Sequence, residues 1–428
     1  MRSCCLLLLL LLPTLATASD GEFTLTRLDG SNWGTSYCLD EPVQALRFER
    51  PIKDFREDYW SPDKGFELAF EEGAALLTRT DGEAFECATF AIRQFTQLPE
   101  KDYFPFATFS NGGVTVYTGH FVPSQRMGDG WQQLELDASF ITRDGERVIG
   151  RNTGKLVEQF LYIGAQEPVK SDGLIAVIDP AMPEQARRNI LDTIPVVNEM
   201  LADTFDFHPA EPYQLFMSTD LDAFDGFSSK GGALPGQMRF TLRGRGITGL
   251  LEEHPTHFSK TAAHEVLHLW QTDHWFSTLG NESPWVHEGS ADALAFELMK
   301  DAGIWSSDEY AARWNATEAD CRKGLEETSV TAAPDNGRFD VVYSCGAVFF
   351  RLVGERLDRD SPGTGIIRFW QAMAARPADA RRVESRVQVF DALDQLGFST
   401  EDRALLETFL DGQGEQALSA THTFRTKN

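Results

Sequence analysis

One ten-residue segment constrains the fold of this chain more than any other feature. Residues 261–270 read TAAHEVLHLW, and the apolar residues around the histidines predict a helix that packs in a core. Residues four apart share one face of a helix, so His264 and His268 can bring both imidazoles to one metal ion. Glu265 lies beside that pair, where its carboxylate can take a proton from a water that the metal activates. The segment therefore predicts a helix that carries part of a zinc site.

A second helix is predicted twenty residues further along the chain. Ser283 and Pro284 favour a helix start, and Gly303 favours its end. If this helix lies antiparallel to the first, Glu288 becomes a third zinc ligand and leaves a fourth position open. Asp292 follows four residues later on the same face, where it can accept the free ring N–H of His264.

The HExxH pattern alone also occurs by chance, and the plain alternative is a core or surface helix that carries two histidines. For Asp292 the alternative is a solvated helix carboxylate. The context favours the metal site, because six of the nine histidines fall between His254 and His287 and the acidic residues follow in the required order.

These motifs together resemble the gluzincin clan of zinc metallopeptidases. The segment 285–289, WVHEG, is similar to the aminopeptidase-N-like and glycyl-aminopeptidase-like families, and the spacing from Glu288 to Asp292 is similar to that in thermolysin. Those families carry a Tyr-x-x-Gly-Ala segment downstream, and residues 343–347, YSCGA, match it. The resemblance implies one Zn²⁺ ion held by three protein ligands. It also implies that Tyr343 donates a hydrogen bond to the developing oxyanion, with a buried core tyrosine as the alternative.

One stretch departs from the aminopeptidase-N-like pattern. Those enzymes place a glutamate that holds the substrate amine on the strand before the HExxH helix, whereas residues 231–240, GGALPGQMRF, contain no acid. We expect Gly232 and Ala233 to bind extended peptide through the backbone at a sheet edge. Arg239 is a candidate contact for an acidic group or a C-terminal carboxylate, with a solvated strand arginine as the alternative. His287, next to Glu288, is a further candidate for the cleft wall.

The rest of the chain predicts a multidomain α+β protein. Residues 19–165 combine short alternating runs with turn signals such as Asn111-Gly112, which predicts a β-rich N-terminal domain. Residues 166–300 predict strands at 174–178, 213–217 and 237–243, and the resemblance implies that this segment is a thermolysin-like α/β catalytic core. Residues 301–428 predict a helical C-terminal part that completes the site.

The N-terminal residues predict export. Arg2 precedes an apolar run that is too short to span a bilayer comfortably, and small residues follow up to Ala18, which is typical of a signal peptide, residues 1–18, cut after Ala18. The mature chain is then secreted or periplasmic, without stable membrane insertion; a membrane anchor is the alternative. The remaining four cysteines favour two disulfides over four free thiols. Three pairings are possible, and the positions along the chain suggest Cys38–Cys87 and Cys321–Cys345.

The charge excludes one class of partner. With 65 acidic against 39 basic residues, the net charge is −26, which argues against nucleic acid and anionic membrane surfaces. The sequence thus predicts zinc-dependent hydrolysis of peptide or protein substrates. Two alternatives stay open: a zinc hydrolase of a non-peptide substrate, and a catalytically weak secreted binding protein that uses its β-rich domain. The oligomeric state is left open.

Overall fold

The computed structural model describes residues 19–49, 53–71, 73–97, 102–171, 173–272, 283–359, 365–376 and 385–427. These residues form two compact units. The first unit holds the described residues up to 95 together with 118–144 and 152–158, and the second holds the described residues of 96–117, 145–151 and 159 onward. The predicted signal peptide, residues 1–18, lies outside the described residues.

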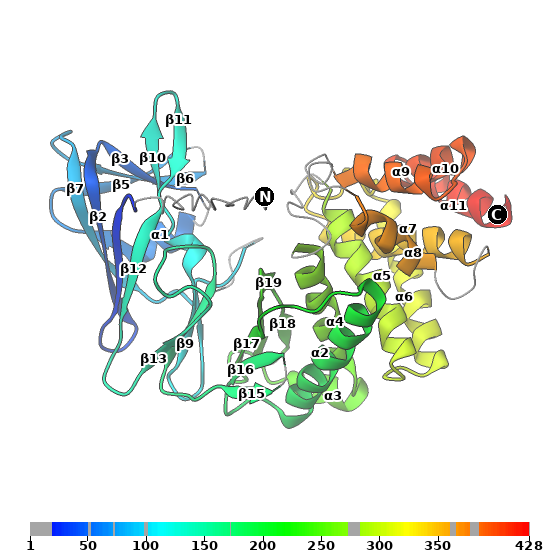
Figure 1. The fold of residues 1–428 in the computed structure, drawn as a ribbon, viewed down its shortest axis with the longest axis horizontal. Coiled ribbons are helices and arrows are strands. Elements are labelled where there is room, and N and C mark those ends of the chain that lie inside the picture. The colour runs from blue at the N-terminus through cyan, green and yellow to red at the C-terminus, as the bar shows by residue number, and fades with distance from the viewer. Residues whose placement is uncertain are drawn as a thin grey trace, which may run out of the picture. The chain divides into compact units, whose positions relative to one another are not determined.

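The first unit is built from two sheets of mostly antiparallel strands (Figure 1). In spatial order, the strands of one sheet are β12 (Leu136–Ile141), β1 (Gly21–Arg27), β2 (Asn32–Val43), β7 (Phe85–Arg93) and β4 (Trp60–Pro62). Those of the other are β11 (Gly130–Gln133), β10 (Ser124–Met127), β3 (Ala45–Phe48), β6 (Ala74–Arg79) and β5 (Phe66–Glu71). A short helix, α1 (Lys53–Tyr59), and a 3₁₀ turn, Thr118–His120, complete the unit.

Alternating burial explains this arrangement, because every second residue of β1 is buried and the others face outward. Phe48, from the second sheet, packs its ring edge-on against Tyr37, Phe90 and Trp60 of the first, with ring centroids 5.2–6.1 Å apart. The two sheets therefore share an aromatic core, as in a sandwich. The predicted Cys38–Cys87 disulfide joins β2 to β7, where the two residues face each other in register.

The second unit contains two further sheets. The larger sheet has the order β15 (Val169–Ser171), β16 (Leu174–Ile178), β17 (Tyr213–Asp220), β20 (Gln237–Arg243) and β18 (Ser228–Lys230), with β19 (Ala233–Leu234) also pairing β20. The smaller sheet has the order β13 (Arg147–Ile149), β14 (Phe160–Gly164), β9 (Val114–Tyr117) and β8 (Phe106–Thr108). The predicted strands at 174–178, 213–217 and 237–243 are thus confirmed, and the turn signal Asn111-Gly112 lies between β8 and β9, which pair antiparallel.

One helix, α2 (Glu184–Phe205), connects β16 to β17, and the other helices follow the larger sheet along the chain. They are α3 (Ile247–Glu253), α4 (His257–Trp270), α5 (Ser290–Asp301), α6 (Ser307–Leu325), α7 (Phe339–Asp358), α8 (Gly365–Ala374), α9 (Ser385–Gln395), α10 (Thr400–Asp411) and α11 (Glu415–Lys427). A π-helical turn, Trp285–Gly289, precedes α5. Among the described residues, no helix combines the length and apolar character that crossing a bilayer requires.

A large apolar core joins the larger sheet of the second unit to the helices, and a smaller apolar cluster joins that sheet to the smaller one. β16, β17 and β20 are parallel neighbours, and β17 is buried along nearly its whole length, which is typical of a sheet covered on both faces. α2 turns Ile190, Ile194 and Val197 into the same core as α4 and the helices up to α11. The predicted α+β fold class, with a β-rich beginning and a helical end, is confirmed. The domain boundaries at 165 and 300 stay a prediction.

Candidate metal centre

The HExxH segment lies on α4, and its helix buries all three polar side chains of the motif. His264, Glu265 and His268 are each only 6–7% exposed. Their neighbours Ala262, Ala263, Val266 and Leu267 are fully buried and fix the helix in the core. Because the two histidines are four residues apart, their Nε2 atoms come within 2.8 Å of each other.

Glu288 reaches the same point from the π-helical turn Trp285–Gly289. A close approach of two glycines sets this turn against α7: a Cβ on Gly289 would meet the backbone of Gly346 at 2.3 Å. Only glycine permits that approach, so α7 can lie directly beside the turn. Tyr343, one helical turn before Gly346, is carried toward the site by the same contact.

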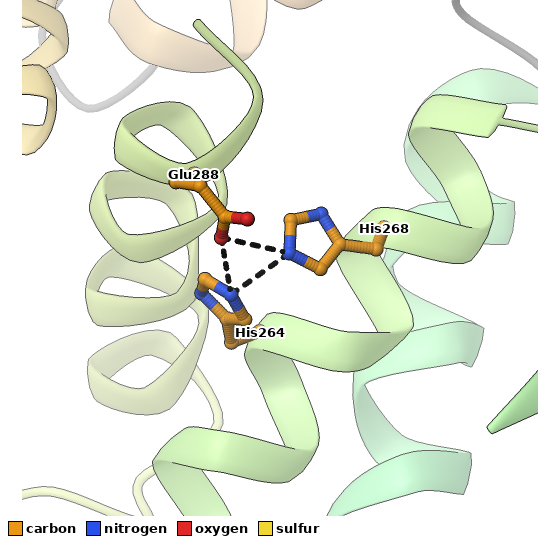
Figure 2. A group of neighbouring side chains, drawn as sticks. All are labelled: His264, His268 and Glu288. Atoms are coloured by element: carbon orange, nitrogen blue, oxygen red, sulfur yellow. Dashed lines mark hydrogen bonds and ion pairs between the residues drawn. The ribbon is translucent and has the colours of Figure 1, made fainter. Parts of the chain in front are cut away.

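The three side chains form a compact ligand set (Figure 2). Glu288 Oε2 lies 3.2 Å from Nε2 of His264 and 3.2 Å from Nε2 of His268. Around a tetrahedral zinc ion with bonds of about 2.1 Å, ligand atoms lie about 3.4 Å apart. Two imidazole nitrogens and one carboxylate oxygen at these distances fit a zinc ion and leave room for a fourth ligand.

Asp292 lies behind His264, on the side away from the ligand set. Its Oδ1 is 2.6 Å from His264 Nδ1, so it can fix the imidazole with Nε2 toward the metal. The same Oδ1 accepts a hydrogen bond from Lys260 Nζ. Lys260 was not predicted; its only sequence signal is its place four residues before His264 on α4.

Gln271 gives His268 the corresponding support. Its Oε1 lies 2.8 Å from His268 Nδ1, while its Nε2 donates to the His287 carbonyl at 3.0 Å and to Ser290 Oγ at 2.9 Å. The amide is thus anchored to the turn that carries Glu288. Sequence reasoning missed Gln271, although it follows His268 by three residues on the same helix face.

Charge pairing in this site moves several pKa values against the effect of burial. Burial lowers the pKa of His264, but Asp292 and Glu288 outweigh it and raise that pKa to about 9. Burial raises the pKa of Glu288, but the two histidines hold it well below its usual range. For Asp292, Lys260 and His264 overcome burial and lower the pKa to about 2. Both carboxylates are therefore ionised at neutral pH, so Glu288 can bind a metal ion and Asp292 can accept a hydrogen bond from His264.

Glu265 differs from the other carboxylates. Its Oε2 is buried without a hydrogen-bond partner among the described residues, and burial raises the pKa of its carboxyl group. The backbone of Gly231 passes directly in front of it: a Cβ on that residue would lie 2.0 Å from Glu265 Oε1. A poorly solvated carboxylate with a raised pKa suits proton transfer.

Tyr343 lies on α7 with its ring stacked on His264 at a centroid distance of 5.9 Å. Burial, followed by the nearby Glu288 carboxylate, raises the pKa of the phenol well above its ordinary value. The hydroxyl therefore stays protonated and can donate a hydrogen bond.

Gly232, Ala233 and Arg239 lie together where β19 pairs with β20. The Gly232 carbonyl accepts from the Arg239 backbone N–H at 2.8 Å, and the Ala233 carbonyl accepts from Tyr103 Oη at 2.9 Å. The Arg239 guanidinium is buried rather than solvated: it donates to the Phe104 carbonyl and lies 4.7 Å from the ring centroid of Phe160. Arg239 thus holds the Gly232 backbone through its own N–H group, while its side chain is buried against Phe104 and Phe160.

His287 stacks face to face on His268, with ring centroids 3.9 Å apart and planes inclined by 18°. Its Nδ1 is buried with no hydrogen-bond partner in the described part of the chain. Burial, reinforced by His268, lowers the pKa of His287 to about 3, so the ring is neutral.

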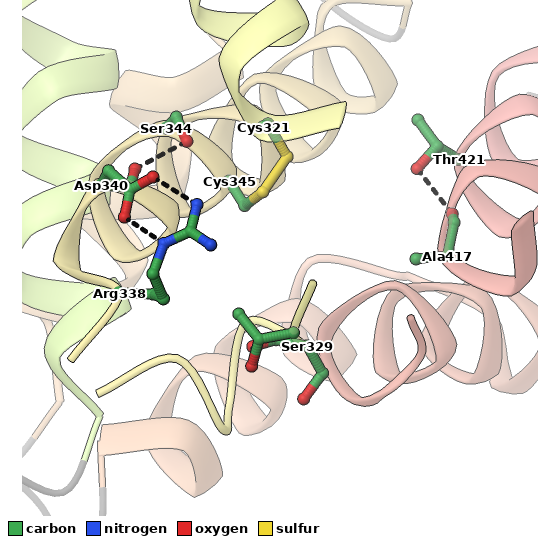
Figure 3. The surroundings of a disulfide bond; sticks show 9 residues. Cys321, Ser329, Arg338, Asp340, Ser344, Cys345, Ala417 and Thr421 are labelled. Carbon is green, nitrogen blue, oxygen red and sulfur yellow. Dashed lines mark hydrogen bonds and ion pairs between the residues drawn. A yellow bond between two sulfur atoms is a disulfide. The ribbon is translucent and has the colours of Figure 1, made fainter. Parts of the chain in front are cut away.

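A cavity of about 440 Å³ adjoins Tyr343 and Asp292 between α6 and α7. Apart from Gly324, its other lining residues are polar or charged: Thr317, Asp320, Lys323, Arg338, Asp340 and Ser344. Arg338 and Asp340 pair at the start of α7, and the predicted Cys321–Cys345 disulfide ties α6 to α7 beside them (Figure 3).

Sequence comparisons and structural comparisons differ in outcome. No protein-family model matches this sequence, and no curated protein matches it. Solved structures do match: yeast LTA4 hydrolase in complex with bestatin aligns with a TM-score of 0.55 at 13% identity, covering 93% of this chain and 68% of that one. Native yeast LTA4 hydrolase aligns with a TM-score of 0.53 at 11% identity, covering 95% and 67%.

A third structure has nearly the same length as this chain. It is a mutant of an M1 zinc metallopeptidase from Deinococcus radiodurans bound to a Tyr-Ser-Ala substrate, with a TM-score of 0.50 at 13% identity and coverage of 92% and 94%. At these identities the likeness shows the fold. The resemblance that the motifs indicated therefore extends over most of the chain as a shared architecture.

Proposed function

From the fold that this chain shares with M1 zinc metallopeptidases, we propose that it hydrolyses peptide bonds with one zinc ion. The observation that carries the proposal is the convergence of His264, His268 and Glu288 on one point, next to the buried Glu265, whose Oε2 has no hydrogen-bond partner within the described ranges. The fourth position around the ion is left for water and substrate.

The roles of the residues follow from their surroundings. A zinc ion in this site would acidify a water molecule and polarise the substrate carbonyl. Glu265 takes the proton of the attacking water and passes it to the leaving amine, for which its raised pKa suits it. Tyr343 donates a hydrogen bond to the carbonyl oxygen as negative charge develops there. Asp292 and Gln271 hold the two histidines in the tautomer that binds metal.

The substrate is proposed to bind as an extended strand along β18 and the following glycines. β18 is an edge strand of the larger sheet. Gly231 follows it in the sequence, and the backbone of Gly231 lies against the Glu265 carboxylate. A peptide that adds to this edge would place a backbone carbonyl near the metal, with Gly232 and Ala233 as backbone contacts. The absence of an acidic residue at 231–240 speaks against recognition of a free amine there.

Two alternatives keep a place. The same residues can activate water against a non-peptide substrate, and the likeness to a structure named LTA4 hydrolase favours including such substrates in a screen. A binding protein that uses the first unit is less well supported, because Glu265 and all three ligands are intact.

Export is proposed from residues 1–18 and the two disulfides. N-terminal sequencing of the protein from its host should begin at Ser19. A chain that retains residues 1–18 would overturn the proposal.

The test of the proposed activity is Glu265→Gln on a broad peptide library. The variant should retain zinc and lose hydrolysis by roughly 10²–10⁴-fold, because only the proton-transfer group is changed. Glu297→Gln is the matched control, since Glu297 is a partly buried carboxylate on α5 that pairs with Tyr310 instead of the site. Full activity in Glu265→Gln, or no hydrolysis by the wild type, would refute the proposal.

A further inference from the structure

At the metal centre, polar residues of α4 alternate with polar residues of the facing segment that contains Glu288 and Asp292. Lys260, His264 and His268 are spaced four apart on α4, and Glu288 and Asp292 are spaced four apart on the facing segment. The contacts run from Lys260 to Asp292, from Asp292 to His264, and from Glu288 to both histidines. The three metal ligands therefore belong to a longer chain of polar contacts, which continues from His264 through Asp292 to Lys260.

Lys260 and His264 share a single acceptor. Lys260 Nζ and His264 Nδ1 both contact Asp292 Oδ1, and the Asp292 side chain is only 11% exposed, against 28% for Lys260. Lys260 donates a hydrogen bond to this oxygen and the His264 ring is in contact with it, so both neighbours restrict the Asp292 side chain. The ammonium also lies 5.9 Å from the ring centroid of Phe296, which limits where it can move.

We propose that Lys260 is a positioning residue of the zinc site: it holds Asp292 Oδ1 against His264 and thereby keeps His264 Nε2 directed at the metal. The inference rests on the proposed zinc site and adds a residue to it. Without Lys260, the Asp292 carboxylate can rotate toward the polar cavity that it also lines, and His264 loses its fixed orientation.

The direction in which zinc affinity changes on loss of Lys260 distinguishes a positioning role from simple charge repulsion. A lysine near a divalent cation repels it, so loss of the positive charge alone would strengthen zinc binding. Loss of orientation would weaken it. Partners of this kind are worth about 10–100-fold in metal affinity, so the two outcomes are distinguishable.

The experiment measures zinc affinity by competition with a chromophoric chelator in Lys260→Met, Lys260→Arg and Lys300→Met. Lys300 is an exposed lysine on α5 whose ammonium lies over the Tyr310 ring, away from the site, and it controls for removal of charge. Lys260→Met should bind zinc about 10-fold more weakly, Lys260→Arg should recover most of the affinity, and Lys300→Met should match the wild type. Thermal melting of the metal-free proteins checks that each variant folds.

A double-mutant cycle tests whether Lys260 acts through Asp292. If it does, Lys260→Met should add almost nothing to the loss of zinc affinity caused by Asp292→Asn. The visible spectrum of the Co²⁺-substituted protein should change in Lys260→Met and not in Lys300→Met. Unchanged or tighter zinc binding in Lys260→Met, or additive losses, would overturn the inference. A wild type that binds no zinc would instead refute the proposed function.

Discussion

The contact between Gly231 and Glu265 allows a sharp test of the proposed catalytic carboxylate. In Gly231→Ala the new methyl group would lie 2.0 Å from Glu265 Oε1, 2.6 Å from Cδ and 2.9 Å from Cγ. Ordinary contact begins at 3.4 Å, so the carboxylate must retreat by about 1.4 Å. A misplacement of about 1 Å in a reacting group costs about 100-fold in rate. That loss corresponds to about 2.7 kcal/mol of transition-state stabilisation.

The assay compares kcat/KM and zinc content in Gly231→Ala and Gly249→Ala. Gly249 is an exposed glycine in α3, and a Cβ there meets nothing within 4 Å, so its variant should behave as the wild type. Gly231→Ala should keep its zinc, because no ligand atom is displaced, and lose about 100-fold in kcat/KM. Equal activities in the two variants would refute the proposal that Glu265, in its observed position, is the carboxylate that transfers the proton.

Three further predictions concern the surroundings of the metal. Tyr343→Phe should lower kcat by roughly 10²–10³-fold with zinc retained, because the oxyanion donor is removed; steady-state kinetics with metal analysis checks this. Between pH 6.5 and about 3 the unfolded chain takes up a proton at His287 that the folded chain refuses, so acid lowers stability there. His287→Gln should flatten that part of the curve of urea midpoint against pH. Removal of the Cys321–Cys345 disulfide by a double serine variant should cost about 3–4 kcal/mol of unfolding free energy by chemical denaturation.

Local spacing explains why much of the site could be predicted from the sequence. His264 and His268 lie one helical turn apart, as do Glu288 and Asp292, and the structure brings all four together. The strands at 174–178 and 237–243 were equally visible: the first is a short apolar run, LIAVI, and the second alternates polar and apolar residues, QMRFTLR.

The features that escaped prediction depend on tertiary contacts. Lys260 on α4 and Gln271 directly after α4 have the right spacing from the two histidines, but only the facing helix shows what they bind. Gly231 is one of many glycines, and only the folded chain places it against Glu265. Strand pairing such as that of β9 with β14 joins residues too distant along the chain to be paired from pattern alone.

The most direct test of the proposed zinc site is the zinc-to-protein ratio of the wild type and Glu288→Ala, each purified without chelator. Glu288 Oε2 is the atom that closes the ligand set, so the wild type should carry one zinc per chain and Glu288→Ala close to none. A wild type without zinc, or a Glu288→Ala variant that keeps a full equivalent, would contradict the zinc site described above.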